Sequence, residues 1–175
     1  MTRSALEDAV RAWVLAASGL AADKVLFAHQ NGVSPVPGPA AIISLGDLSS
    51  VGLDETSHTY DVSRPAGQEI EYTAAAVVET IASVSLFTRE TVGDSSAMAR
   101  AERCRVALSL PSVRDALNAA GVGVMAASTV RWVPEVDGAR WQGQAVLEVR
   151  LVLRQTATER TGYISSVEFN QTTTE

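Results

Sequence analysis

The predicted fold follows from one stretch near the C-terminus, residues 144–154, which reads QAVLEVRLVLR. Every odd-numbered residue in it is apolar, whereas the even-numbered residues are mostly polar or charged, with two valines among them. Successive side chains of a β-strand point to opposite faces of the sheet, so this alternation predicts a long strand with one apolar face. A helix would scatter the same apolar residues around its axis. We therefore expect an antiparallel-type sheet whose apolar face is covered by helices.

Length and composition predict a single α+β domain over residues 1–175 and exclude several classes of protein. The 175 residues, of which 46% are hydrophobic, suffice for one core. The net charge of −6 argues against a surface that grips nucleic acid, which needs many Lys and Arg residues. The first residues carry Glu7 and Asp8 and do not resemble a signal peptide. No stretch approaches the roughly 20 apolar residues of a membrane span, so no membrane partner is expected.

Three helices are predicted from apolar periodicity and capping residues. The first begins with a capping box, Ser4 and Glu7, and ends at Gly19. A second begins near Asp94-Ser95 and runs to about Leu110, where Pro111 stops it. A third, short helix follows over residues 112–120 and ends at Gly121. The predicted strands are Val25–Gln30, Ala40–Leu45, Gln68–Thr73, Ala76–Thr88, Val122–Val133, about Arg140–Thr156, and Tyr163–Phe169.

A polar, turn-rich excursion separates two of these strands and predicts a projecting β-hairpin arm over about residues 46–71. Its segment 58–62 has strand character. An excursion of this length in a small domain usually binds something or is disordered. Elsewhere, the proline-rich stretch 33–39 predicts a stiff connector, and residues 170–175 predict a polar C-terminal tail.

The residues give no sign of catalysis, a cofactor or a metal site. Nucleophilic chemistry would need Cys104 or a serine beside His29 or His58, and no Gly-x-Ser-x-Gly elbow or phosphate-binding glycine loop occurs. One cysteine and two histidines exclude a disulfide framework and any local zinc spacing. The sequence therefore predicts a protein that is not an enzyme and holds no cofactor.

The polar face of the strand at 144–154 is the most informative surface. Glu148, Arg150 and Arg154 alternate there with two valines. One interpretation is an ordinary solvated sheet face. The other is a self-association face, where charged residues among apolar ones fix the register of a partner. The projecting arm, with Tyr60 on it, supports the second interpretation.

Both ends of the chain carry a familiar pattern. At the start these residues are Val10-Arg11-Ala12-Trp13, Ser18-Gly19-Leu20, Lys24-Val25-Leu26 and His29-Gln30-Asn31-Gly32. At the end they are Ala145 to Arg154 and Thr161-Gly162-Tyr163-Ile164-Ser165-Ser166-Val167. With the expected sheet, arm and helix pair between them, they resemble the neck and tail terminator proteins of tailed bacteriophages. The chain departs at Pro39-Ala40-Ala41, where an aromatic residue is expected after the proline.

This resemblance implies a structural virion protein, assembled in the host cytoplasm and resident in the neck of the particle. About six copies would form a ring on the head-proximal end of the tail tube, stop its polymerisation and join the tail to a head connector or stopper protein. A sheath is a further possible partner. Genomic DNA would pass through the lumen without specific binding, helped by acidic residues. The candidates for these lumen acids are Asp47, Asp54, Glu55, Glu69 and Glu71.

Two alternatives remain open on the sequence alone. One is another virion connector, such as a head–tail stopper or tail-completion subunit, which differs in where its ring docks. A small bacterial ligand-binding or enzymatic α+β domain is the other, and it predicts a closed apolar pocket near His29 or Cys104.

Overall fold

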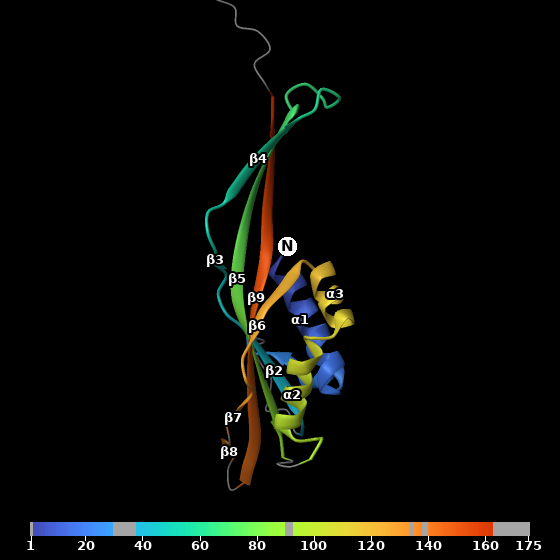
Figure 1. Cartoon of the computed structure of the whole chain (residues 1–175), viewed down its shortest axis with the longest axis vertical. Coiled ribbons are helices and arrows are strands. Elements are labelled where there is room, and N and C mark those ends of the chain that lie inside the picture. The colour runs from blue at the N-terminus through green and yellow to red at the C-terminus, as the bar shows by residue number, and fades with distance from the viewer. Residues whose placement is uncertain (1, 30–37, 90–92, 134, 138–139, 163–175) are drawn as a thin grey trace, which may run out of the picture.

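The computed structural model describes residues 2–29, 38–89, 93–133, 135–137 and 140–162. It confirms an α+β fold in which the helices lie on one face of a mixed sheet (Figure 1). The helices are α1 (Arg3–Ser18), the 3-10 turn η1 (Ala22–Lys24), α2 (Ala97–Ala107) and α3 (Pro111–Ala119). The strands are β1 (Val25–Phe27), β2 (Ala40–Leu45), β3 (Ser49–Ser50), β4 (Glu55–Tyr60), β5 (Ile70–Thr88), β6 (Val122–Ala127), β7 (Arg131–Trp132), β8 (Glu135–Asp137) and β9 (Arg140–Thr161).

Two long antiparallel strands, β5 and β9, form the spine of the molecule (Figure 1). Their register runs without a break from Ile70 opposite Thr161 to Thr88 opposite Gly143. The sheet order is β1-β2-β5-β9-β6, with β1 parallel to β2 and the other pairs antiparallel. The strand predicted from 144–154 is thus confirmed, and it extends past its predicted end at Thr156 to Thr161.

The core lies between the helices and one face of β5 and β9. The predicted alternation is seen directly, because the odd-numbered residues of β9 from Ala145 to Leu153 are all buried. The even-numbered residues of β5 from Val78 to Thr88 share that face and are buried as well. Helices α1 and α2 cover it with small and branched side chains, among them Val10, Val14 and Ala101.

The junction of α1 and α2 is held by polar contacts as well as by packing. The indole nitrogen of Trp13 donates to the carbonyl oxygen of Cys104 at 3.2 Å in the buried interface. The guanidinium of Arg100 donates to the carbonyl oxygen of Ser18 at 2.7 Å, at the C-terminal end of α1. Gly19 follows with φ of 67°, so the predicted left-handed end of this helix is confirmed.

The projecting arm is a three-stranded structure rather than the predicted two-stranded hairpin. β4 and the first part of β5 form the hairpin, and the last part of β9 lies along the other side of β5 (Figure 1). Ile70 is thus opposite Tyr60 on one side and Thr161 on the other. Because β9 passes along the whole length of β5, the arm continues the sheet of the body.

Several predicted boundaries were wrong for reasons that are visible in the structure. The cap of α1 is Thr2, whose hydroxyl accepts from the amide of Ala5, and Ser4 lies inside the helix. The break expected near residues 74–75 is absent because strands on both sides hydrogen-bond this part of β5. The strand expected over 122–133 is split into β6 and β7, and a bulge interrupts β6 between Val124 and Ala126.

Smaller shifts affect the ends of other elements. Helix α2 starts at Ala97 with Ser96 as its cap, two or three residues later than the sequence indicated. Strand β1 ends at Phe27. The connector at 33–39, except Gly38 and Pro39, the strand expected over 163–169 and the tail at 170–175 lie outside the described residues.

Candidate assembly surfaces

The face of the sheet opposite the helices carries no helix and is called the bare face here (Figure 1). It consists of the odd-numbered residues of β5 from Val77 to Phe87 and the even-numbered residues of β9 from Gln144 to Arg154. Val77 is 44% and Ile81 49% exposed, although both lie near the middle of β5, which has a strand on each side. Cover by another chain would remove this apolar surface from water, which is favourable.

Three of the four residues predicted to contact a neighbouring subunit lie together on the bare face, and each has a charged partner within the chain. Glu148 accepts from Arg131 at 2.6 Å, the guanidinium of Arg150 lies 4.0 Å from Glu79, and that of Arg154 lies 3.8 Å from Glu55. The side chains of Glu148, Arg150 and Arg154 are 44%, 53% and 66% exposed. Exposed pairs of this kind stabilise a fold by at most about 1 kcal/mol, so they exchange readily for charges on a partner.

The fourth predicted contact, Tyr60, lies elsewhere. The strand register puts it beside Ile70 on the side of the arm that faces the same way as the helices. Tyr60 is 50% exposed and Tyr72, on the same side, is 46% exposed with its ring near that of His58. Tyr60 therefore does not join the bare face, and the four residues form two separate surfaces.

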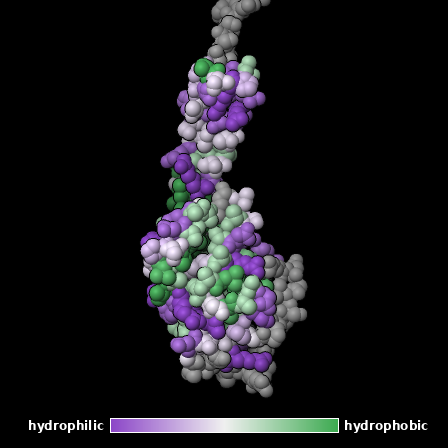
Figure 2. All heavy atoms as spheres, turned by 90° about the vertical axis from the view of Figure 1, so that its right-hand side faces the viewer, coloured by the Kyte–Doolittle hydropathy of each residue, from purple (hydrophilic) through white to green (hydrophobic). Residues whose placement is uncertain are grey.

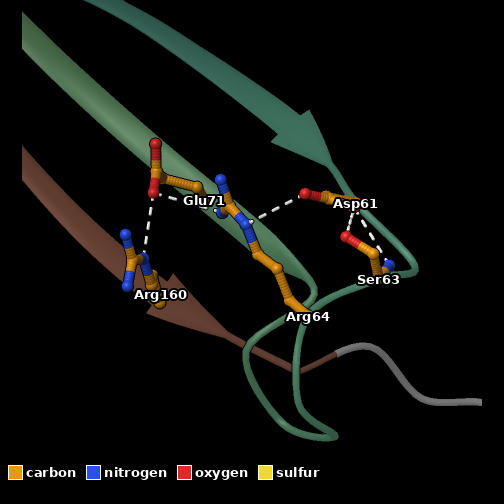
Figure 3. A network of polar contacts seen from close by, with 5 residues as sticks. All are labelled: Asp61, Ser63, Arg64, Glu71 and Arg160. Atoms are coloured by element: carbon orange, nitrogen blue, oxygen red, sulfur yellow. Dashed lines mark hydrogen bonds and ion pairs between the residues drawn. The ribbon is translucent and has the colours of Figure 1, made fainter.

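The tip of the arm is held by a charged network centred on Glu71 (Figure 3). One of its carboxylate oxygens accepts from Arg64 at 3.1 Å and from Arg160 at 2.9 Å. Arg64 also lies 3.4 Å from Asp61, which in turn accepts from the hydroxyl and the amide of Ser63. The network thus connects the hairpin turn to the end of β9.

The network also lowers the pKa of both acids. The hydrogen bond from Arg160 and the charge of Arg64 lower the pKa of Glu71 below its ordinary value of 4.5. Hydrogen bonds from Ser63, with the charge of Arg64, lower the pKa of Asp61 below 3.8. Both carboxylates are therefore charged at neutral pH.

The acids proposed for a DNA-facing lumen have different surroundings. Glu55 and Glu71 pair with arginines, and Glu69 accepts from the amide of Gly67 at 2.9 Å in the hairpin turn. Asp47 and Asp54 lie in exposed loops beside β3, without an ion pair in the part of the chain that the structure describes. Of the five candidate acids, Asp47 and Asp54 are thus the two whose charge is uncompensated among the described residues.

The hairpin part of the arm is largely exposed to solvent. All six residues of β4 are exposed, and Leu53 and Val62 at its two ends are 96% and 75% exposed. Seen from the helix side, the arm is mostly hydrophilic, whereas apolar patches lie over the body (Figure 2). Ala75 is buried in the arm, but no apolar cluster supports β4.

Sequence reasoning missed the third strand of the arm and the two arginines that hold Glu71. A signal was present in residues 155–161, QTATERT, which are rich in threonine and alternate with smaller or charged residues. Which acid Arg160 reaches was not predictable, because Glu71 is 89 residues away in the chain.

The residues weighed for chemistry are separated in the structure. Cys104 is fully buried, and this burial raises the pKa of its thiol to about 12. His29 is exposed beside Phe27 and 3.8 Å from Glu7, and His58 lies on the arm. The described residues contain no group of three or more His, Cys, Asp or Glu side chains arranged for a metal. Two surface hollows, one at Val106 and Leu110 and one at Gly123 and Val152, are not lined by His29, His58 or Cys104.

Among the described residues, no helix combines the length and the apolar character needed to cross a membrane.

A known protein family matches nearly the whole chain. Residues 4–175 match the sequence profile of a family described as "Phage neck terminator protein". Among solved structures, the chain is similar to the sheath/tube terminator of an extracellular contractile injection system, PVC, in its extended state, with 14% identity and a TM-score of 0.48. That alignment covers all of this chain and 65% of the terminator. A search of curated proteins gave no match.

Proposed function

The chain belongs to the phage neck terminator protein family, and from this premise we propose that it forms a ring on the head-proximal end of a phage tail tube. The ring, of about six copies, ends tube polymerisation and joins the tail to a head connector or stopper protein. The observation that carries this proposal is the family match over residues 4–175, which includes both the body and the arm. The protein is a component of the virion neck, assembled in the host cytoplasm.

The architecture supports a role in assembly more than a role in chemistry. One face of the sheet builds the core with the helices, and the other presents Val77, Ile81 and a set of paired charges. A small subunit that must contact copies of itself, a tube and a connector needs several independent surfaces. The bare face, the arm and the helix side provide three, and a sheath is a further partner for them. We propose no catalytic activity and no cofactor.

Contacts between subunits are assigned to the bare face and the arm. We propose that Glu148, Arg150 and Arg154 exchange their internal partners for charges on the neighbouring copy, because each lies at a surface where the present pair is exposed. Tyr60 contributes from the arm, since aromatic side chains bury a large area at little entropic cost.

Passage of DNA requires a lumen that does not bind it. Asp47 and Asp54 are the stronger candidates for lumen acids, because they keep their charge uncompensated among the described residues. Glu55, Glu69 and Glu71 remain in the proposal as a second group, whose charge is partly neutralised by Arg154, Arg64, Arg160 and a backbone amide. Like charges repel DNA over about one Debye length, roughly 8 Å in physiological salt.

The test is capping of tail tubes made from the tube protein of the same phage. Added protein should shorten the tubes in proportion to its concentration and appear at one end only by electron microscopy. The assembled ring should have a mass near six times 18.4 kDa by mass photometry. A protein that binds the connector ring and ignores tubes of any length would assign it instead to the stopper or tail-completion class.

A further inference from the structure

The arm has two open edges, one on each side. β4 pairs with β5 on one side, and the structure pairs no described strand with its other side. β9 pairs with β6 through residues 149–153 and with β7 at 145–146, so its segment from Thr156 to Thr161 pairs only with β5 among the described residues. Among the described residues, the arm is therefore a three-stranded ribbon, β4-β5-β9, with no further strand paired to either of its long sides.

The backbone groups that point outward from β4 can be assigned. The amide of Asp61 donates to the carbonyl of Glu69, which makes 61 and 69 a hydrogen-bonded pair at the end of the hairpin. Hydrogen-bonded and open pairs alternate along an antiparallel ladder. Residues 55, 57 and 59 therefore bond to β5, whereas Thr56 and His58 direct their amides and carbonyls away from it.

The same reasoning applies to β9. The carbonyl of Glu148 accepts from Ser128, and that of Gln144 accepts from Val133, so even-numbered residues point away from β5. Because the register with β5 continues unbroken to Thr161, Thr156, Thr158 and Arg160 direct their backbone groups to the open side. Each edge thus offers a regular row of donors and acceptors.

Three features that often protect an exposed strand, namely proline, lysine and a bulge, are absent from both edges. β4 reads ETSHTY and residues 155–161 of β9 read QTATERT, without proline or lysine and with no bulge against β5. Threonine favours strands. A ribbon of this kind has little apolar burial to stabilise it, so added strand pairing would contribute much of its order.

We propose that the β4 edge of one copy pairs with the β9 edge of the next, so that the arms of neighbouring copies form one continuous sheet around the ring. This inference rests on the proposed ring and specifies the contact that closes it. Because the two edges lie on opposite sides of one ribbon, each copy is donor on one side and acceptor on the other, which is the heterologous arrangement that generates rings.

The direction of the pairing follows from the topology. Both β4 and β9 run antiparallel to β5, so they run parallel to each other. Rotation about a ring axis that lies along the arm preserves strand direction. The neighbour's β9 therefore meets β4 in parallel, in contrast to the antiparallel pairing of two β4 edges in a two-fold dimer.

Charge on the two edges is complementary. On the side of the arm that continues the bare face, β4 carries Glu55, whereas β9 carries Arg154 and Arg160. Two antiparallel β9 edges would bring arginines together, whereas two antiparallel β4 edges would set the two copies of Glu55 at opposite ends of the contact and gain no opposite charge. Pairing of unlike edges places the acid of one copy near the arginines of the next.

Proline substitution at an outward-facing amide tests the proposal. Thr56→Pro and Thr158→Pro each remove one donor of the open edge and leave the bonds to β5 in place. Each variant should lose the ring while retaining the circular dichroism spectrum and melting transition of the folded chain. The matched controls, Thr56→Val and Thr158→Val, keep the amide and should assemble as the wild type does.

A mixing experiment separates the possible edge pairings. Thr56→Pro keeps an intact β9 edge and Thr158→Pro keeps an intact β4 edge, so an equimolar mixture should form one-to-one heterodimers and no ring. Pairing of β4 with β4 predicts instead that Thr158→Pro alone forms dimers. Either that result or rings formed by both proline variants would overturn the proposal.

Assembly is measured both in solution, by mass, and on tube ends, by electron microscopy. The two measurements together distinguish failure of the edge pairing from failure of the terminator function. A wild-type protein that assembles in neither setting and leaves tube length unchanged contradicts the terminator function itself. Proline variants that still form rings and cap tubes contradict only the edge pairing, and the ring would then be held by the bare face.

Discussion

Glu71 illustrates how much one side chain organises in this protein. Its carboxylate on β5 accepts from Arg64 of the hairpin turn and from Arg160 at the end of β9, so one side chain joins three elements of the arm (Figure 3). Asp61 and Ser63 extend the contacts around the turn. The body is held together by an apolar core, whereas the tip of the arm is held by these polar contacts. The ordered conformation of the tip therefore depends on the charges of its side chains.

The arm should therefore loosen in acid. The folded-state pKa of Glu71 lies below its ordinary 4.5, so its contribution is present above that value and is lost as the pH falls through the lower folded pKa. We expect hydrogen-exchange protection of amides 61–71 to hold at neutral pH and to decline below pH 4.5.

Two variants give this experiment its controls. Glu71→Gln should lower the protection at neutral pH and flatten the decline. Glu159 is exposed on the same arm and has no ion pair among the described residues. The control variant Glu159→Gln should therefore show the same decline of hydrogen-exchange protection with pH as the wild type. An arm whose protection is equal at both pH extremes would show that the network does not order it.

Cys104 should be inert in the folded protein. It is completely buried on α2, and burial raises the pKa of its thiol to about 12, so almost no thiolate forms at mildly alkaline pH. A thiol reagent should react only at the rate of unfolding, and urea should release one reactive thiol per chain. Rapid labelling of the native protein would contradict this burial and reopen a chemical role for Cys104.

At the scale of elements, the junction of α1 and α2 shows how helix ends are satisfied across the fold. Near the end of α2 the amide of Leu108 bonds to Arg105, which leaves the carbonyl of Cys104 to be satisfied by the indole of Trp13. The carbonyl oxygen of Ser18 accepts hydrogen bonds from the guanidinium groups of Arg100, at 2.7 Å, and Arg103, at 3.4 Å. Each helix thus supplies donors for the end of the other.

Loss of the indole donor should cost more than loss of ring volume alone. Trp13→Phe leaves the buried carbonyl of Cys104 without this donor, and an unsatisfied buried group costs about 1–3 kcal/mol. Urea unfolding followed by far-UV circular dichroism should show the lower midpoint. Trp132→Phe, at a site 41% exposed, is the control and should lose less. Equal losses would mean that the hydrogen bond contributes nothing specific.

At the scale of the whole molecule, the body and the arm have different physical bases. The body has a core between helices and sheet, whereas the arm is a ribbon extended beyond the helices (Figure 1). β3 belongs to the body, because Ser49 and Ser50 pair with β5 and Gly46 bonds to Ile81. The removable part of the arm therefore begins after Val51 rather than at Gly46.

Removal of the arm should separate folding from assembly. The amide of Val51 donates to the carbonyl of Val77 at 2.8 Å, so a two-residue Asn-Gly turn can replace residues 52–76 at this pair. The chain is also ended after Arg154, because residues 155–161 pair with the deleted part of β5. The shortened chain should remain a cooperatively folded monomer and should neither form rings nor cap tubes. Intact rings would assign the subunit contact to the bare face alone. Loss of cooperative unfolding would show that the body needs the arm.

Elements with local signals in the sequence could be predicted from it. Alternation over residues 144–154 fixes a strand and its buried face, and the apolar stripe of α1 with Gly19 after it fixes a helix and its end. The resemblance of both chain ends to phage terminators predicted the family, and the match over residues 4–175 confirms it.

Features that depend on partners far away in the chain could be seen only in the folded protein. β5 crosses Ala74 and Ala75 without a break because β4 and β9 hydrogen-bond it from both sides, which outweighs the low strand propensity of alanine. The third strand of the arm and the pairing of Arg160 with Glu71 likewise require β9 to return along β5 over its full length. Local propensity specifies which segments form strands. The free energy of strand pairing specifies where each strand ends and which strand it pairs with.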